Sequence, residues 1–251
     1  MFSRIVLISA VLLLTSSWSP SLPAGTSANA QAIVERADDI RFPRKSFQIS
    51  ITVTSSVKAG TSSVHEYQLL QKGHENSVVR TLSPATEKGQ VMLLKGSELW
   101  LFLPSVSQPV RLPLAQRLTG QVANGDLARA NFAGDYNASL LKEEEIKGRR
   151  YYVLELLAAR KGVTYHRVMY WVDSANYRPY RAEFYTLSNR LMKVGIYDSY
   201  REMAGAIRPA RLTLKDALRI GEESVIEYNA MKLRDIPDKF FTKDFLRKLG
   251  N

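Results

Sequence analysis

The residue types that carry out most enzymatic and metal chemistry are sparse in this 251-residue chain. It has no cysteine, and its three histidines, His65, His74 and His166, are not at the spacing of metal ligands. It contains neither a G-x-S-x-G nucleophile elbow nor a glycine-rich loop ahead of a helix. The acidic run Glu143–Glu145 falls in a predicted strand, where successive side chains point to opposite faces and cannot form an acid–base pair. We therefore predict that the protein is not an enzyme and uses no metal or cofactor.

The more informative feature is an excess of apolar residues in segments that resemble β-strands. A strand with one face in water should alternate apolar and polar residues. Four stretches instead are apolar on both faces: Leu99–Leu103, Tyr151–Leu154, Val168–Val172 and Leu191–Ile196. Either a second layer covers the other face, as in an ordinary core, or that face lines an apolar cavity. Composition alone leaves both interpretations open.

The secondary structure elements that position these residues can be predicted from the spacing at which apolar residues recur along the chain. From Phe47 to Val53 apolar and polar residues alternate, which predicts a half-buried strand. Further strands follow at regular intervals with no helix between neighbours, which favours an antiparallel meander, closed or nearly so. The predicted strands are 64–71, 77–82, 90–95, 98–103, 140–146, 149–157, 164–172, 178–187, 190–200, 207–214 and 224–233.

Three segments depart from the strand pattern. Residues 32–40 have helical spacing, with Pro43 as a stop. The middle segment, 104–135, contains three prolines and then Asn124 and Asp126, either of which could cap a short helix with apolar residues at Leu127 and Phe132. A connection of this length inside a compact domain is usually functional or has structure of its own. The tail, 237–249, is predicted to be a terminal helix or turn that packs phenylalanines inward.

The N-terminus has the features of an export signal. Arg4 precedes the apolar run 5–14, and a small-x-small cleavage site follows, with cleavage after Ala30 or after Ala32. We therefore predict a signal peptide at 1–30, a single domain at 31–251 and a location in a bacterial periplasm. The formal net charge of +11 is compatible with anionic lipid or an acidic partner. Export from the cytosol argues against nucleic acid.

A series of short motifs follows in a characteristic order and spacing along the chain. They are Leu99–Pro104, Pro109–Arg111, Gln116–Arg117, Asn124–Arg129, Phe132–Tyr136, Tyr152–Glu155, Tyr170–Asp173, Tyr177–Pro179 and Lys239–Leu246. Taken together, these motifs resemble the outer membrane lipoprotein-sorting protein family. The resemblance covers nearly the whole mature chain, and the middle segment has the N-G-D-x-A-R-x-x-F-A-G-D-Y form, which we interpret as a subgroup.

The resemblance implies a mainly β fold like that of the LolA and LolB carriers. In that fold a curved antiparallel sheet forms an incompletely closed half β-barrel, and short helices cover its concave side. It also implies a periplasmic carrier that holds the acyl chains of a lipoprotein or lipid cargo and moves it towards the outer membrane. Such a carrier would touch the membrane surface transiently and would serve an inner-membrane transporter. The arginine that holds the lid of LolA closed has no counterpart assignable by motif.

Candidate site residues follow from the apolar strands and the middle segment. Leu127 and Phe132 are candidates for a lid helix. The candidates for the hydrophobic cavity, or for the core, are Trp100, Phe102, Tyr152, Leu154, Met169, Trp171 and Phe184. The rival hypothesis is an accessory subunit of an inner-membrane exporter of the RND type that carries nothing. Its docking surface would include Arg178, Tyr180 and Arg181.

Overall fold

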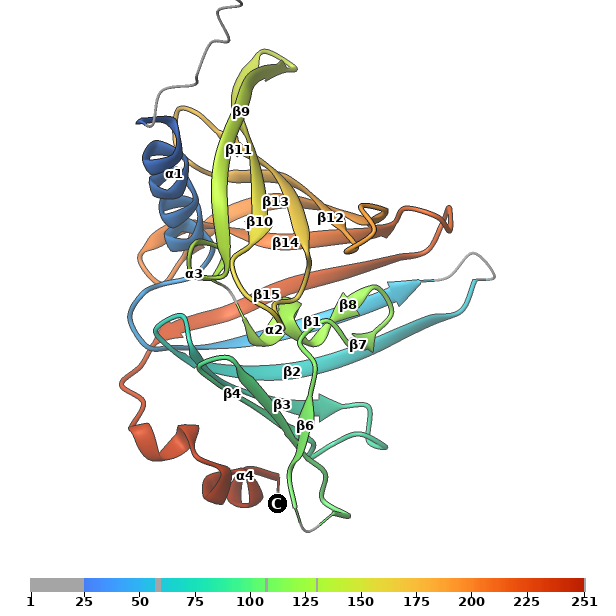
Figure 1. Cartoon of the computed structure of the whole chain (residues 1–251). Helices are drawn as coiled ribbons and strands as arrows, with labels where there is room; N and C mark the ends of the chain where they lie inside the picture. The colour runs from blue at the N-terminus through green and yellow to red at the C-terminus, as the bar shows by residue number, and fades with distance from the viewer. Residues whose placement is uncertain (1–24, 57–59, 107, 130, 251) are drawn as a thin grey trace, which may run out of the picture.

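The computed structural model describes residues 25–56, 60–106, 108–129 and 131–250 (Figure 1). Residues 1–24, most of the predicted signal peptide, lie outside the described residues. The described part is dominated by one large antiparallel sheet, with a few helices. The predicted mainly β fold is therefore confirmed.

The large sheet has 13 strands in the described part of the chain. In β1 (Phe47–Ser56) every second residue is buried, as the alternation predicts. The strands that follow lie close to the predicted ranges, except β6 (Val110–Leu112), which lies in the middle segment where no strand was predicted. They are β2 (Ser62–Lys72), β3 (Asn76–Ser83), β4 (Val91–Lys95), β5 (Glu98–Phe102), β6 (Val110–Leu112), β9 (Tyr136–Ile146), β10 (Arg149–Ala158), β11 (Arg167–Asp173), β12 (Pro179–Tyr185), β13 (Leu191–Met203), β14 (Ala206–Asp216) and β15 (Glu223–Leu233).

The strand order shows that the sheet is open, with β6 and β9 at its two edges. The order is β6-β5-β4-β3-β2-β1-β15-β14-β13-β12-β11-β10-β9, so β1 pairs with β15 and joins the two halves. Apart from two short strands that belong to a separate small sheet, the two edge strands, β6 and β9, follow each other along the chain. The connection between them, residues 113–135, contributes side chains to the main core of the sheet. We call residues 113–135 the plug segment; residue 130 within it is not described.

The plug segment contains more structure than the sequence predicts. It forms the two-stranded hairpin β7 (Arg117–Thr119) and β8 (Val122–Ala123), followed by α2 (Asn124–Ala128) and α3 (Phe132–Asp135). The prediction of one helix containing both Leu127 and Phe132 is therefore wrong. Leu127 belongs to α2, which ends at Ala128, and Phe132 begins the separate helix α3. The Asn131 side chain accepts a hydrogen bond from Gly134 N and starts a new helix at Phe132.

The N-terminal helix lies against the same face of the sheet. Helix α1 (Gly25–Arg41) begins before the predicted residue 32 and ends two residues before Pro43. Its buried residues Ala30, Ile33, Val34 and Ala37 recur at helical spacing and join the main core. Helices α1, α2 and α3 thus cover the concave face of the sheet (Figure 1).

The C-terminal tail covers part of the opposite face, which we call the outer face. The turn of 3-10 helix η1 (Asp238–Phe241) and helix α4 (Lys243–Gly250) pack on β3, β4 and β5. Phe241 and Leu246 are buried there with Leu93 in a cluster separate from the main core. The tail is therefore helical, as predicted, but it packs on the outer face and not in the interior. This second layer is one reason why those strands are apolar on both faces.

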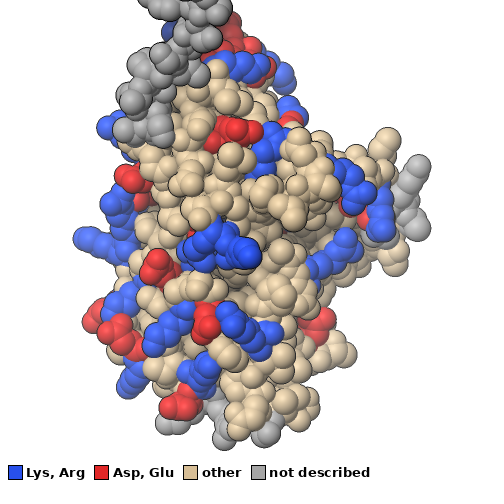
Figure 2. Space-filling model, viewed as in Figure 1, with Lys and Arg blue, Asp and Glu red and all other residues tan. Residues whose placement is uncertain are grey.

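Two further properties bear on the function. Of the helices that the structure describes, none combines the length and apolar character needed to cross a bilayer. On the face shown in Figure 2, Lys and Arg side chains are spread over the surface with Asp and Glu among them, not gathered in one run. Net charge by itself therefore does not mark a site.

Candidate functional site

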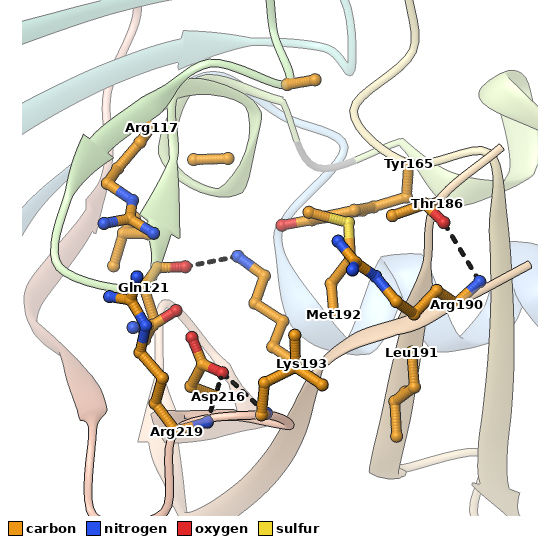
Figure 3. Close-up of a pocket in the computed structure, with 14 residues that line it drawn as sticks. Arg117, Gln121, Tyr165, Thr186, Arg190, Leu191, Met192, Lys193, Asp216 and Arg219 are labelled. Carbon is orange, nitrogen blue, oxygen red and sulfur yellow. Dashed lines mark hydrogen bonds between the residues drawn. The ribbon is translucent and has the colours of Figure 1, made fainter. Parts of the chain in front are cut away.

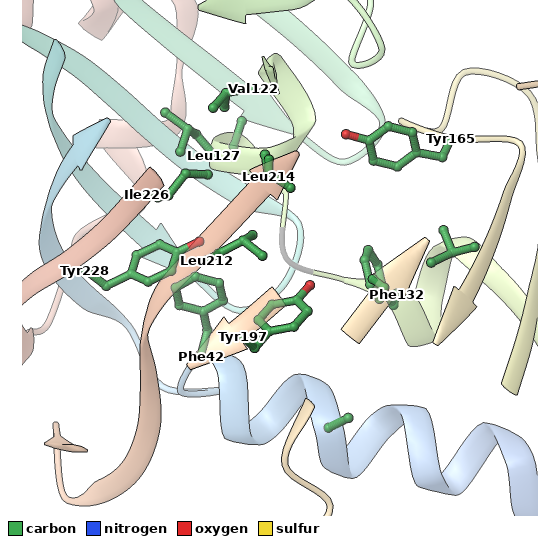
Figure 4. Close-up of a cluster of buried hydrophobic side chains, with 14 of the residues drawn as sticks. Phe42, Val122, Leu127, Phe132, Tyr165, Tyr197, Leu212, Leu214, Ile226 and Tyr228 are labelled. Carbon is green, nitrogen blue, oxygen red and sulfur yellow. The ribbon is translucent and has the colours of Figure 1, made fainter. Parts of the chain in front are cut away.

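The concave interior is filled by side chains of the chain itself. From the plug segment, Leu114, Val122, Leu127 and Phe132 are buried in the main core with residues of α1 and of the strands. Figure 4 shows Val122 and Leu127 beside the strand residues Leu212, Leu214 and Ile226, and Phe132 near Tyr197. The plug segment and α1 thus occupy the space that the half-barrel encloses. Of the two interpretations left open by the sequence, the described residues therefore show a filled core and not an open apolar cavity.

A buried ion pair fixes the plug segment to the sheet. The Lys193 ammonium on β13 lies 2.8 Å from the Asp126 carboxylate of α2, and their side chains are 6% and 8% exposed. Lys193 also donates to the carbonyl of Gln121. The Tyr165 hydroxyl donates to both Asp126 oxygens, at 2.7 and 2.8 Å. Burial, together with the charge of Asp126, raises the pKa of Tyr165 well above its ordinary value.

Asp126 has a second role inside the plug segment. Its carboxylate accepts a hydrogen bond of 2.8 Å from Ala123 N, at the start of α2. The N-cap residue of α2 is Ala123, so the prediction that Asn124 or Asp126 occupies that position is wrong. Asp126 is the third residue of the helix, and its side chain instead accepts from the amide of the N-cap residue. One carboxylate therefore organises the helix and anchors it to β13.

A second buried ion pair closes the other end of the plug segment. The Arg129 guanidinium donates two hydrogen bonds to the Asp135 carboxylate, and Arg160 donates a third at 2.6 Å. Arg129 also donates to the carbonyl of Gly96, in the turn between β4 and β5, at 2.5 Å. Ser77 on β3 donates to the carbonyl of Ala128 at 2.6 Å. This network links α2 and α3 to both halves of the sheet.

Helix α1 contributes a third set of polar contacts. The Asp38 carboxylate accepts a 2.8 Å hydrogen bond from Ala133 N of α3 and pairs with Arg41 at 3.3 Å. The Arg41 guanidinium lies 4.4 Å from the centroid of the Phe132 ring. Burial raises the pKa of Asp38 to about 6, against the opposing effect of Arg41. The Gln31 amide also donates to the carbonyl of Ala133 at 2.6 Å.

Two hollows lie at the rim where the plug segment meets the turns of the sheet. The first, of about 240 Å³, is lined by Arg117, Lys193 and Arg219 among others (Figure 3). The second, of about 340 Å³, is largely apolar and includes Val163 and Leu187. Both are lined by Ala115, Tyr165, Thr186 and Met192. Pockets for small ligands measure roughly 300–1,000 Å³, so neither hollow has room for a three-chain lipid anchor while the plug segment is in place.

The structure separates the seven cavity candidates between the two faces of the sheet. Tyr152, Leu154 and Phe184 face the concave interior. Trp100 and Phe102 face outwards beneath η1 and α4. Met169 and Trp171 lie in a third cluster, also on the outer face, with Tyr151 and Val153. Hence the seven side chains do not come together. The two lid candidates, Leu127 and Phe132, both lie in the plug segment.

The charged residues of the plug contacts were not among the candidates drawn from the sequence. Asp126 and Asp135 stand in the motifs of the middle segment, but their partners Lys193 and Arg160 are 67 and 25 positions away along the chain. The one sequence feature that could have indicated these contacts is the presence of acidic residues in the proline-containing middle segment. In the part of the chain that the structure describes, no three His, Asp or Glu residues lie close enough to hold a metal ion.

The fold and this arrangement define a class of protein: an open antiparallel half-barrel whose concavity is filled by the connection between its edge strands. A family model described as "-like: Uncharacterized protein" matches residues 73–248. A LolA superfamily protein from Nitrosomonas europaea is 53% identical, with 86% of this chain and 98% of that chain covered and a TM-score of 0.83. This chain belongs to the LolA superfamily.

More distant structures share the fold. A DUF1329 family protein from Desulfovibrio piger is 19% identical, with a TM-score of 0.75 over 88% of this chain and 99% of its own. A domain proposed to be an outer membrane lipoprotein-sorting protein, from Vibrio parahaemolyticus, is 17% identical, with a TM-score of 0.74 over 88% and 99%. No curated protein matches the chain. At these identities the two structures establish the fold alone.

Proposed function

We propose that this protein is a periplasmic carrier that binds the acyl chains of a lipoprotein or lipid in the concave interior of its sheet. The observation that carries the proposal is that the interior is filled by α1 and by the connection between the two edge strands, which is not itself part of the sheet. Such a connection can swing out while the paired strands remain together. The apolar faces of the strands would then be open to hydrocarbon chains, each methylene of which gains about 0.8 kcal/mol on leaving water.

The way in which the plug segment is held supports this mechanism. Buried ion pairs such as Asp126–Lys193 lose much of their Coulomb energy to desolvation, and they often stabilise a fold no more than apolar residues of the same size. When the plug segment opens, water can solvate both charges again. These contacts therefore define one closed position without making the interior as costly to open as a solid core. Binding and release of this kind involve no bond cleavage, so we propose no catalytic residue.

The comparisons support the same class of cargo. The LolA superfamily relative and the lipoprotein-sorting domain have the same architecture over most of their length. We propose an acylated lipoprotein or a lipid as the cargo, an inner-membrane transporter as its source, and only a transient contact with the membrane surface. Nucleic acid is not a proposed partner.

A reversible cross-link between the plug segment and the wall tests the proposal. A Cβ atom placed on Gly125 of α2 would lie 3.0 Å from the Thr164 Cβ. The Cβ–Cβ distance in disulfides is about 3.5–4.5 Å, so a shift of about half an ångström between the two segments brings the pair into range. Because the chain has no cysteine of its own, the pair Gly125→Cys with Thr164→Cys can form one defined disulfide. We expect the oxidised protein to lose binding of a fluorescent fatty acid, and the reduced protein to bind it.

The same preparation supplies the controls. A Cβ atom on Gly125 would collide with the native Thr164 Oγ1, so the controls are Thr164→Cys alone and Gly125→Cys combined with Thr164→Ala. Both should bind the fatty acid under oxidising and under reducing conditions. Circular dichroism of the oxidised double variant should retain the β-sheet signal. Equal fatty-acid binding by the oxidised and reduced double variant would mean that the ligand does not need the plug segment to move, and the carrier mechanism would fail.

The contacts of α1 bear on the site of signal cleavage. We propose cleavage after Ala30, giving a mature domain of residues 31–251, which loses the small buried side chain of Ala30 but keeps Gln31. Cleavage after Ala32 would remove Gln31, whose amide bonds to the carbonyl of Ala133 and to Ala138 N. N-terminal sequencing of protein isolated from the periplasm should read Gln-Ala-Ile-Val. A start at Ile33 would contradict the role given to Gln31.

One observation favours the rival hypothesis of an accessory subunit. A hollow of about 340 Å³ on the surface is lined by Tyr151, Arg178 and Tyr180, among others, and the two tyrosine rings lie 4.7 Å apart. Arg181 lies instead over the Trp171 ring. Such an aromatic and basic hollow could take a side chain of a transporter. Loss of transporter co-purification in Tyr180→Ser, with fatty-acid binding intact, would favour this second function.

A further inference from the structure

Two neighbouring turns at the rim expose large apolar side chains. The turn between β12 and β13 presents Leu187, which is 80% exposed, and the turn between β14 and β15 presents Leu218 and Ile220, which are 63% and 86% exposed. Single exposed apolar residues are common on soluble proteins, but a group of them usually marks an interaction site. These three lie at the tips of two turns that share an edge of the molecule.

Hydrogen bonds order the backbone of both turns. Ala217 N donates to the carbonyl of Met192 at 3.0 Å and ties the β14–β15 turn to the start of β13. The Asp216 carboxylate accepts from Leu218 N and Arg219 N at 2.8 and 2.9 Å. Arg190 N donates to the Thr186 hydroxyl at 3.0 Å. The apolar residues are thus fixed in an outward position.

Each of the two turns also contains an arginine, and a third arginine lies in the hollow beside them. Arg117, Arg190 and Arg219 are exposed and line the 240 Å³ hollow beside the turns (Figure 3). Two carboxylates are nearby. Asp216 is engaged by the backbone of the turn, and Glu222 lies 3.4 Å from Arg219 and accepts a bond from Gln121. Outward apolar residues with arginines around them match a bilayer surface, where the apolar groups enter the lipid and the guanidiniums meet phosphates.

We propose that Leu187, Leu218, Ile220, Arg117, Arg190 and Arg219, which we call the rim patch, form a docking surface for an anionic phospholipid bilayer. The same rim holds both hollows and the residue, Lys193, that anchors the plug segment. Docking would therefore place the mouth of the half-barrel against the membrane. The use of this orientation for cargo transfer rests on the proposed function, whereas the docking itself does not.

Flotation with lipid vesicles tests the rim patch. The full mature protein is mixed with vesicles of phosphatidylcholine containing phosphatidylglycerol, or of phosphatidylcholine alone, and the bound fraction is measured. We expect binding to the anionic vesicles that weakens as salt is added. Leu187→Ser with Leu218→Ser and Ile220→Ser should reduce the affinity roughly tenfold or more. Replacing the three arginines by glutamine should reduce it about fivefold for each one.

Matched controls come from exposed residues elsewhere on the chain. Leu141→Ser with Leu157→Ser and Leu233→Ser removes three other exposed leucines, and glutamine at Arg44, Arg150 and Arg234 removes three other exposed arginines. Both control sets should float as the unmodified protein does. All variants should show the same unfolding midpoint, because none of these side chains is buried.

The outcomes separate the docking surface from the carrier function. Loss of flotation in the rim variants, with binding of a free fluorescent fatty acid unchanged, supports the rim patch. Three results overturn it: no flotation of the unmodified protein, full flotation of the serine variant, or equal loss in the control sets. If the unmodified protein binds the fatty acid but not the vesicles, the carrier proposal stands and the docking surface fails. If it binds the vesicles but not the fatty acid, the reverse holds.

Discussion

Lys193 on strand β13 and Asp126 on helix α2 form a buried ion pair, 2.8 Å between the ammonium nitrogen and the carboxylate. The pair joins a strand of the wall to the segment that fills the concavity. Removal of either partner leaves the other charge buried without its counter-charge. Lys193→Met should therefore lower the free energy of unfolding by about 3–5 kcal/mol, as measured by urea denaturation.

The double variant Asp126→Asn with Lys193→Met supplies the control for this pair. It removes both charges, so its loss of stability should be smaller than the sum of the two single losses. Additive losses would show that the two groups do not interact in solution.

A second prediction concerns Phe132 of the plug segment. The centroid of its ring lies 5.4 Å from that of Tyr170, and the Arg41 guanidinium lies over the ring. Phe132→Ala should therefore lower the free energy of unfolding of the closed native state by about 3–5 kcal/mol. It should also shift the plug segment towards its open position, giving faster uptake of a fluorescent fatty acid in stopped-flow measurements. Leu93→Ala is the matched control, because Leu93 is also buried but lies in the separate cluster on the outer face, away from the plug segment. Faster uptake in both variants would argue against a mobile plug.

A third prediction separates the two faces of the sheet. Tyr152 is half-buried on the concave face, whereas Trp100 lies on the outer face under Lys243. Tyr152→Ala should weaken fatty-acid binding, and Trp100→Ala should leave the affinity unchanged while destabilising the C-terminal helix. Titration of the same fluorescent ligand measures both. A loss of affinity in Trp100→Ala alone would place the ligand on the outer face.

The fourth prediction is a pH dependence that comes from Asp38. Burial raises its pKa from 3.8 to about 6, so between about pH 4 and pH 6 the native state binds more protons at this site than the unfolded chain does. The contribution of Asp38 to the free energy of unfolding therefore falls as the pH rises through this window, by up to about 3 kcal/mol. The stability difference between the unmodified protein and Asp38→Asn, measured by denaturation at several pH values, should fall with it.

Asp216 provides a control of opposite sign. Although partial burial acts against it, the hydrogen bonds from Leu218 N and Arg219 N lower the pKa of Asp216. Its contribution to stability should thus be present at neutral pH and lost in acid, so the advantage over Asp216→Asn should grow as the pH rises. If both stability differences changed in the same direction with pH, the burial of Asp38 would not govern its titration.

Much of this architecture could be predicted from local sequence patterns. The alternation that begins at Phe47 set the strand β1, and the prolines and the Asn124–Asp126 turn marked the middle segment as distinct. The resemblance to lipoprotein-sorting proteins indicated the open half-barrel that the structure shows. These inferences succeeded because side-chain period and turn residues act between near neighbours along the chain.

Local sequence patterns were enough to predict most of the residues that form strands and which of them share a face. Alternation places Tyr152 with Leu154, and Met169 with Trp171, but does not say which pair faces the concavity. Only the tertiary structure decided that, because it depends on the curvature of the whole sheet and on where α1, the plug segment and α4 pack. Nor does any local pattern link Asp126 to Lys193, 67 residues away. A buried charge selects its partner by position in space, and distance along the chain has no bearing on that choice.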